Sequence, residues 1–151
     1  MDLHQFLLDR TTTILAEATN SMARSHVTHY EQSGADHTHQ RLKALFVLTA
    51  RAVQDRNLAP MAAHADTIAR ERFTAGFDLW EVQTALNVLE EVIWKMLLKE
   101  FPSAELPEAL GLVSTILGVG KDTLARRYVS LAAKMRVSSF NLQSLFHGLD
   151  A

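Results

Sequence analysis

One stretch constrains the fold more than any other: residues 72–101, R-F-T-A-G-F-D-L-W-E-V-Q-T-A-L-N-V-L-E-E-V-I-W-K-M-L-L-K-E-F. Its apolar residues recur at alternating steps of three and four, which is typical of one face of an α-helix. They are Leu79, Val82, Leu86, Leu89, Ile93 and Met96. Further apolar residues widen this face: Val88, Val92, Trp94, Leu97 and Leu98. A helix that is apolar over so much of its circumference needs neighbours on several sides, so it is predicted to be central in a helical fold.

The sequence also predicts where this helix begins and ends. Gly76 interrupts the helical pattern that precedes it, and Asp78 is a candidate N-cap. Glu81 follows Asp78 by three residues, as in a capping box. Pro102 ends the helix, because proline disfavours helical geometry in the residue before it.

The rest of the chain also reads as helix. Helical patterns cover residues 2 to about 30, 36–56, 60 to about 75, and 107 onward, and no segment shows sustained strand alternation. Thr11–Thr13 is a weak point in the first pattern. Gly34 is expected to cap that helix, Asp36 to begin the next, and Pro60 to occupy a first turn. We therefore predict an all-α, up-and-down bundle of about five helices with a long C-terminal helix, in a single domain spanning residues 1–151.

The last helical pattern is longer than the body of the domain. Apolar positions advance by three or four from Leu110 to Leu145, and such a helix would extend roughly 55–60 Å. A domain of this size has a radius of gyration of about 15 Å. The helix either breaks, folds back near Ser138–Ser139, or projects from the body. Three glycines are candidate break points, but we expect the helix to survive them and the glycines to allow close helix contact; they are Gly111, Gly118 and Gly120.

Composition excludes several classes of function. The chain has 15 Lys and Arg against 17 Asp and Glu, a net charge of −2, whereas a nucleic-acid-binding domain is expected to be clearly basic. It contains no cysteine, which excludes disulfides, thiol catalysis and cysteine-ligated metals. The N-terminus lacks the basic leader of a signal peptide, and no apolar run approaches the ~18 residues of a membrane span. We expect a soluble, cytoplasmic protein that binds neither nucleic acid nor membrane.

No motif in the chain indicates catalysis or a cofactor. Glycine-rich phosphate loops and nucleophile motifs are missing. Four histidines flank the loop at residues 31–36, but they lack the spacing of a zinc site, and solvated histidines explain them better. His64 is the one histidine deep in a helical pattern, yet it lacks the bulky apolar neighbours of a haem pocket. We predict no enzyme activity, no metal and no cofactor.

Charge is distributed unevenly between the two long C-terminal helical patterns. Between residues 121 and 136 five basic residues oppose one acidic residue, a net charge of +4. Residues 77–108 carry seven acidic residues against two basic ones, a net charge of −5. Opposite charge predicts that the two helices pair, within one chain or between chains. Of the adjacent Glu90 and Glu91, one is expected to be solvated and the other interhelical.

The junction before the central helix carries a family resemblance. The residues that carry it are Arg72, Gly76, Phe77, Leu79, Glu81, Val82 and the aliphatic run to Trp94. This pattern resembles the N-terminal domain family of the RsbRD-type RsbT co-antagonists, and it extends weakly from His29–Tyr30 to Tyr128. The resemblance implies a helical input domain of the bacterial stressosome or a related signalling protein. It implies no catalytic residue, and it leaves open whether the chain works alone or precedes an output domain.

The sequence therefore predicts a sensory or regulatory domain that acts through protein–protein contact as a homodimer. An exposed apolar stripe on the last helix would be buried between two copies. The expected contact residues are Leu124, Tyr128, Leu131, Met135, Leu142 and Leu145. The alternative is a bundle that binds a small ligand, haem or a metal between its helices.

Arg72 and the two tryptophans of residues 72–101 lead to specific expectations. Arg72 is expected to hydrogen-bond carbonyls or a carboxylate at the corner before the central helix. Trp94, deep in the apolar run, is expected to be buried, and Trp80, next to the cap, to be partly exposed.

Overall fold

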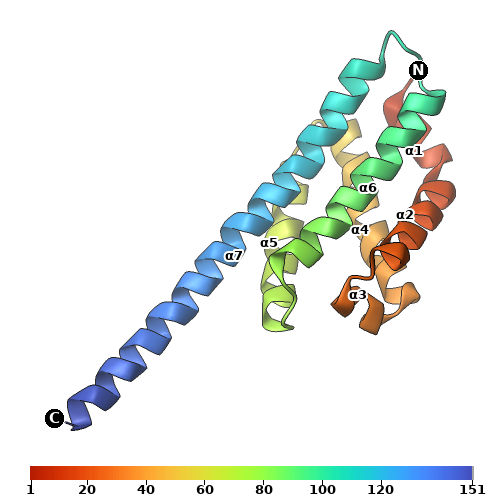
Figure 1. The fold of residues 1–151 in the computed structure, drawn as a ribbon. Coiled ribbons are helices and arrows are strands. Elements are labelled where there is room, and N and C mark those ends of the chain that lie inside the picture. The colour runs from red at the N-terminus through yellow and green to blue at the C-terminus, as the bar shows by residue number, and fades with distance from the viewer. Residues whose placement is uncertain (151) are drawn as a thin grey trace.

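A computed structural model describes the backbone of residues 1–150 and the side chains of residues 1–136, and its secondary structure is entirely α-helical over the described backbone. The helices pack side by side, and the last one extends well beyond the others (Figure 1). In chain order they are α1 (Leu3–Asp9), α2 (Thr11–Ser25), α3 (Thr28–Ser33), α4 (Ala35–Asp55), α5 (Ala59–Thr74), α6 (Leu79–Glu100) and α7 (Leu106–Asp150). The all-α class is confirmed. The predicted number of about five helices is wrong, because the described residues form seven.

The difference in number arises in the first thirty residues, where three helices replace the predicted single one. The first break falls at Arg10, whose backbone leaves helical geometry at φ −112° and ψ 13°. Thr11 then begins α2, and its hydroxyl donates back to the carbonyl of Leu8 at 2.8 Å. A local hydrogen bond of this kind competes with the regular helical ladder. The weak point predicted at the threonines is therefore a complete break that precedes them.

Gly34 both ends α3 and precedes α4. Its φ of 89° lies in the region that L side chains rarely adopt, so a glycine is needed there. The predicted C-cap is confirmed. The N-cap of α4 is also Gly34 rather than Asp36, because α4 already begins at Ala35. Pro60 stands in the first turn of α5, as predicted.

The central helix begins and ends as its sequence indicates. Asp78 and Glu81 form a complete capping box, in which each side chain accepts from the other residue's backbone N–H. Gly76 turns the chain before it with a φ of 86°. The helix stops at Glu100, and Phe101 is extended in front of Pro102.

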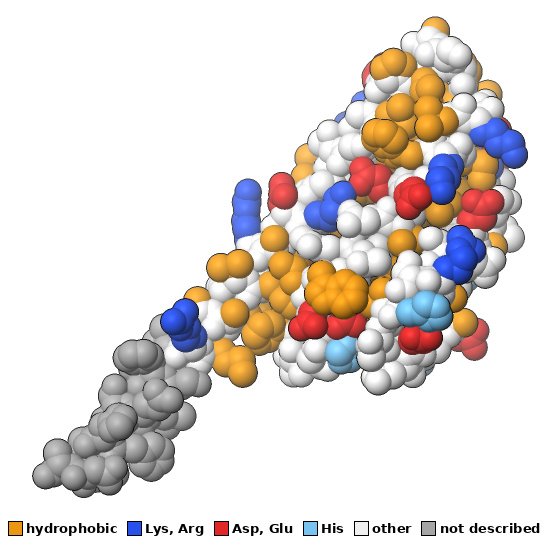
Figure 2. All heavy atoms as spheres, in the orientation of Figure 1, with side chains coloured by type: hydrophobic (Ala, Val, Ile, Leu, Met, Phe, Trp, Pro, Cys, Tyr) orange, Lys and Arg blue, Asp and Glu red, His pale blue; other side chains and the backbone are white. Residues whose placement is uncertain are grey.

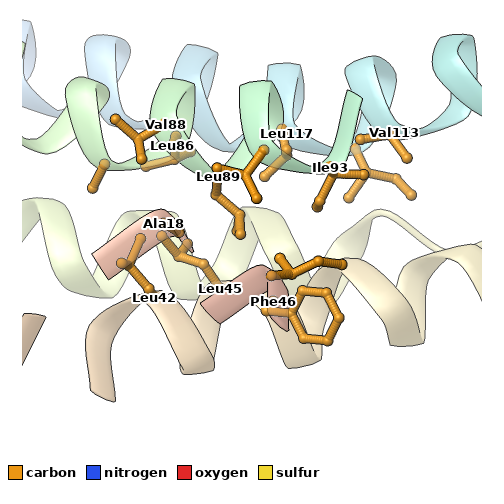
Figure 3. Close-up of a cluster of buried hydrophobic side chains, with 14 of the residues drawn as sticks. Ala18, Leu42, Leu45, Phe46, Leu86, Val88, Leu89, Ile93, Val113 and Leu117 are labelled. Atoms are coloured by element: carbon orange, nitrogen blue, oxygen red, sulfur yellow. The ribbon is translucent and has the colours of Figure 1, made fainter. Parts of the chain in front are cut away.

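The hydrophobic core lies around α6, which contacts α2, α3, α4 and α7. Leu86, Leu89 and Ile93 of α6 face the apolar side of α4, and α7 covers α6 from behind (Figure 3). The buried side chains in this view include Leu42, Leu45, Phe46, Leu86, Leu89, Ile93, Val113 and Leu117. Each large apolar side chain buried in this way stabilises the fold by about 1.5–3 kcal/mol. The prediction that the stretch at residues 72–101 supplies the central helix is confirmed.

The last helix is continuous. α7 runs for 45 residues through all three glycines and through Ser138–Ser139, so neither a break nor a fold-back occurs. At 1.5 Å per residue it is roughly 65 Å long. Of these three glycines, only Gly120 makes a close contact: a Cβ on Gly120 would lie 2.9 Å from Cδ2 of Leu86 in α6, whereas a Cβ on Gly111 or Gly118 would have no neighbour within 4 Å.

Over the described residues, no helix combines the length and the apolar character that crossing a membrane requires.

Candidate functional site

A buried carboxylate joins α3 to the start of α6. Glu81 is only 2% exposed. Its oxygens accept hydrogen bonds from the backbone N–H of His29 at 3.1 Å and from that of Asp78 at 3.0 Å. His29 Nδ1 lies 2.8 Å from Oε1 of the same carboxylate and donates to it. A single side chain therefore caps α6 and holds α3 against it.

The pKa of Glu81 reflects these contacts. Burial raises the pKa, because it disfavours the charged carboxylate, but the hydrogen bonds from Asp78 and His29 outweigh burial. The net result is a pKa below the ordinary value of 4.5. Glu81 is therefore ionised at neutral pH, and the hydrogen bonds that His29 and Asp78 donate stabilise its negative charge.

Aromatic rings surround this carboxylate. The His29 imidazole stacks on Phe77, with ring centroids 4.6 Å apart. The Tyr30 ring packs edge-on against Phe77, with ring centroids 5.5 Å apart. The hydroxyl of Tyr128 in α7 donates to the carbonyl of Phe77 at 3.0 Å. Helices α3 and α7 and the turn before α6 are thus fixed together at Phe77.

Two arginines lie beside the same aromatic cluster. The guanidinium of Arg41 is 5.3 Å from the Tyr30 ring and 5.4 Å from the Phe77 ring, and that of Arg72 is 5.7 Å from Phe77. Arg72 Nη1 donates to Oε2 of Glu71 at 3.2 Å. Arg41 Nη1 and Arg72 Nε are buried and have no hydrogen-bond partner among the described residues. Two half-buried positive groups therefore lie near the same Phe77 ring, and their hydrogen-bonding capacity is only partly used.

These arginines line a cavity of about 190 Å³ between α4, α5 and α6. Most of its wall is apolar, formed by residues that include Leu45, Ile68, Val82 and Leu86. His64 also lines the cavity, and burial followed by the positive charge of Arg72 lowers the pKa of its imidazole. The site thus combines an apolar body with one cationic end.

The sequence did not indicate this cavity, although one signal for it exists. Arg41 stands next to Leu42 and four residues before Leu45, so it lies beside the apolar face of α4 where a long charged side chain is unusual. Arg72 was singled out, and its hydrogen-bond partner is the exposed Glu71 carboxylate. Apart from Trp94, which lies farther along α6, the remaining motif residues lie at the same corner: Gly76 forms the turn, Phe77 and Val82 are buried, and Leu79 is half-buried.

The histidines around the first loop do not converge. His26 lies 3.2 Å from the exposed carboxylate of Glu31, and His29 is bound by Glu81. In the part of the chain whose side chains are described, no three metal-ligating residues gather into a possible metal site.

The surface of α7 changes along its length. Leu124 and Tyr128 are buried inside the chain's own bundle, whereas Leu131 is half-buried and Met135 is 64% exposed. The side chains of Leu142 and Leu145 lie outside the described residues. Figure 2 shows hydrophobic side chains on the part of α7 where it leaves the bundle. The apolar stripe predicted from the sequence therefore begins inside the fold and continues past it.

The predicted charge pairing occurs within one chain. Lys121 of α7 binds Glu90 of α6 at 2.7 Å, as predicted. Arg127 of α7 binds Asp66 of α5 at 2.6 Å, and Asp66 lies outside the predicted acidic stretch at residues 77–108. Glu91 instead forms an exposed pair with Lys95 on its own helix. The assignment of one interhelical and one solvated glutamate is thus confirmed.

Trp94 does not lie where its sequence position indicated. Its side chain is 37% exposed, and that of Trp80 is 56% exposed. The apolar run around Trp94 covers more of the helix than its neighbours can enclose, so part of that run faces solvent. The predicted burial of Trp94 is wrong, and the partial exposure of Trp80 is confirmed.

Comparison with known proteins gives one match. A family model described as RsbT co-antagonist protein rsbRD N-terminal domain matches residues 7–134. Neither the curated proteins nor the solved structures contain a significant match. The matched region includes the buried junction, the arginine-lined cavity and α7 up to the point where it leaves the bundle.

Proposed function

Because the chain belongs to the family of the RsbT co-antagonist protein rsbRD N-terminal domain, we propose that it is a regulatory input domain that acts through protein–protein contact and forms a homodimer through α7. The family description itself names an antagonism directed at a protein, which supports a protein partner. A helical domain without a catalytic motif in its sequence fits this role.

One observation supports the homodimer above all others: the apolar face of α7 extends beyond the bundle that covers its first half. α6 has 22 residues and α7 has 45, so α6 is long enough to accompany only half of α7. Met135 lies one heptad beyond Tyr128, so both side chains point in nearly the same direction from the helix. Tyr128 is buried by the bundle, whereas Met135 is exposed in the single chain.

A second copy of the chain would cover this face efficiently. In a two-fold contact the same stripe of each copy is buried against the other, which removes twice the apolar surface from water. Lys134 and Arg136 are exposed beside the stripe and form no ion pair among the described residues. They are available to acidic residues of the second copy or of another partner.

The oligomeric state tests the proposal directly. We expect sedimentation equilibrium at tens of micromolar to give a species of twice the 16.9 kDa chain mass. Met135→Asp should convert it into a folded monomer, because Met135 contributes nothing to the chain's own core. A 16.9 kDa species in the unmodified protein would remove the homodimer from the proposal.

A matched variant controls for the added charge. Ala133 is exposed and stands two residues before Met135, roughly 200° away around the helix. Ala133→Asp should therefore leave the dimer intact. Leu131→Asp reports on the border of the contact: because Leu131 is half-buried, its variant should lose both dimerisation and part of its folding stability. Equal weakening by Ala133→Asp and Met135→Asp would contradict a contact on the Met135 face.

A further inference from the structure

We propose that the cavity between α4, α5 and α6 binds a small organic monocarboxylate with a compact apolar body, which Arg41 and Arg72 hold by its carboxylate. This binding is independent of the contact proposed for α7, since the cavity lies within a single chain.

The first reason is that one buried nitrogen in each of the two guanidinium groups has no hydrogen-bond partner among the described residues. Arginine stays charged at any ordinary pH, and its N–H groups donate but cannot accept hydrogen bonds. A buried donor without a partner is costly, and more so when it is charged. Arg41 Nη1 and Arg72 Nε are both buried in this way, and both side chains line the cavity. An acceptor placed in the cavity would satisfy them.

The second reason is that the neighbouring acidic residues do not neutralise the pair. Glu81, the buried carboxylate of this region, directs its oxygens to His29 and to the backbone of Asp78. Glu71 binds Arg72 from the exposed rim, with 62% of its side chain in solvent. The other titratable groups that line the cavity are His64 and Tyr30. The pKa of His64 is lowered and that of Tyr30 is raised by burial, so both side chains are neutral at pH 7. Two positive charges thus face one rim carboxylate.

The two arginines also repel each other, because both carry a positive charge and both line the same cavity. Burial lowers the pKa of Arg41, and the positive charge of Arg72 lowers it further. A bound anion would lie between two like charges and relieve both effects. The two guanidinium groups also offer the planar N–H pairs that bind a carboxylate through two parallel hydrogen bonds.

The shape and lining of the cavity select the rest of the ligand. A cavity of ~150 Å³ lined by Leu, Ile and Phe holds benzene, and this one measures about 190 Å³. Its aliphatic wall, from residues such as Leu45, Ile68 and Leu86, is suited to a ring or a branched chain. Inorganic phosphate would satisfy the arginines but leave this wall uncovered. A carboxylate attached to a ring-sized apolar body satisfies both parts, and benzoate is the simplest such compound.

Calorimetric titration of the full chain with benzoate tests the site. We expect saturable binding with one benzoate per chain. Benzamide has the same shape without the charge, and it should bind about ten- to a hundredfold more weakly, because charge-assisted hydrogen bonds are lost. Phosphate should bind at least as weakly as benzamide. Equal affinity for benzoate and benzamide would overturn the role of the arginines. A higher affinity for phosphate than for benzoate would overturn the choice of a carboxylate.

Variants locate the binding within the chain. Arg41→Gln and Arg72→Gln should each weaken benzoate binding about ten- to a hundredfold while circular dichroism shows an unchanged helix content. Arg70→Gln is the matched control, since Arg70 stands on the same helix as Arg72 but pairs with Asp66 at the surface. Unchanged affinity in Arg41→Gln, or equal loss in Arg70→Gln, would show that benzoate binds elsewhere. A second readout is the NMR chemical shift of the His64 ring. It should change as benzoate is added to the unmodified chain and remain constant as benzoate is added to Arg72→Gln.

Discussion

The carboxylate of Glu81 lies 2.8 Å from Nδ1 of His29, although 52 residues separate them in the chain. Glu81 also completes the capping box of its own helix. The same two oxygens therefore make a local contact, which defines where α6 begins, and a distant one, which places α3 against it. Helix capping and tertiary packing depend on one ionised side chain at this position.

Removal of the Glu81 side chain should destabilise the fold. Glu81→Ala leaves the backbone N–H groups of His29 and Asp78 without their acceptor at a partly buried site. We expect the free energy of unfolding in urea to fall by about 2–4 kcal/mol. Glu91→Ala is the control, because Glu91 forms only an exposed pair with Lys95 and should change stability by less than about 0.5 kcal/mol. Equal effects of the two variants would contradict the role assigned to Glu81.

The same carboxylate should make stability depend on acid pH. Its pKa is lowered by folding, so its contribution is complete above the ordinary value of 4.5 and is lost as the pH falls through the lower folded-state value. The difference in unfolding free energy between the unmodified chain and Glu81→Gln should therefore narrow below pH 4.5. Urea unfolding at a series of pH values measures this difference. A difference that is constant across the acid range would show that the charge of Glu81 contributes nothing.

Alanine at two neighbouring glycines should have opposite effects. A Cβ on Gly120 would lie 2.9 Å from Leu86 Cδ2 and 3.4 Å from Met61 Sδ, so Gly120→Ala should destabilise the fold by about 1–3 kcal/mol. A Cβ on Gly118 meets nothing within 4 Å, so Gly118→Ala should stabilise α7 by about 0.5–1 kcal/mol. Thermal unfolding of the two variants checks both signs in one experiment. Stabilisation by both would mean that α6 and α7 can move apart at little cost.

Tyr128 should resist ionisation at alkaline pH. Burial, followed by the proximity of Tyr30, raises its pKa from 10.0 to about 12. Its contribution to stability is therefore complete below pH 10.0 and is lost as the pH rises toward 12. An absorbance titration of the Tyr30→Phe variant follows Tyr128 alone, since the chain has two tyrosines. Tyrosinate appearing near pH 10.0 in the folded variant would contradict the burial of this hydroxyl.

Iodide should quench the fluorescence of both tryptophans. Trp80 is 56% exposed and Trp94 is 37% exposed, so quenching should be somewhat stronger for Trp80. The variants Trp94→Phe and Trp80→Phe isolate one tryptophan each. Complete protection of Trp94 in the dimeric protein, relieved in Met135→Asp, would place this part of α6 in the dimer contact as well.

Local features of this fold could be predicted from the sequence, because their causes are local. The capping box needs only Asp78 and Glu81 at the correct spacing, and the turn before it needs only Gly76. The continuity of α7 follows from an apolar period that no proline interrupts after Pro107. Each of these depends on residues within a few positions of one another, where backbone geometry alone decides the outcome.

Features that depend on distant residues could not be predicted. Nothing in the sequence near His29 indicates that its partner is Glu81, and Arg41 shares no local pattern with Arg72. The exposure of Trp94 has the same origin, since an apolar helix does not reveal which part of its circumference its neighbours leave open. The break at Arg10 depends on a small difference in free energy between one continuous helix and two separate helices. Tertiary contacts, which the local sequence does not reveal, decide the sign of such a difference.

An unbroken helix of this length is also a lever. Gly120 lets α7 lie against α6 near the middle of the bundle, and the helix runs for 30 residues beyond it to Asp150. A tilt of about 5° at that contact would displace the far end by about 4 Å, given 1.5 Å per residue. Leu86 lines the arginine-bearing cavity and also lies next to Gly120. A small change in packing around Leu86 would therefore produce a larger displacement at the far end of α7.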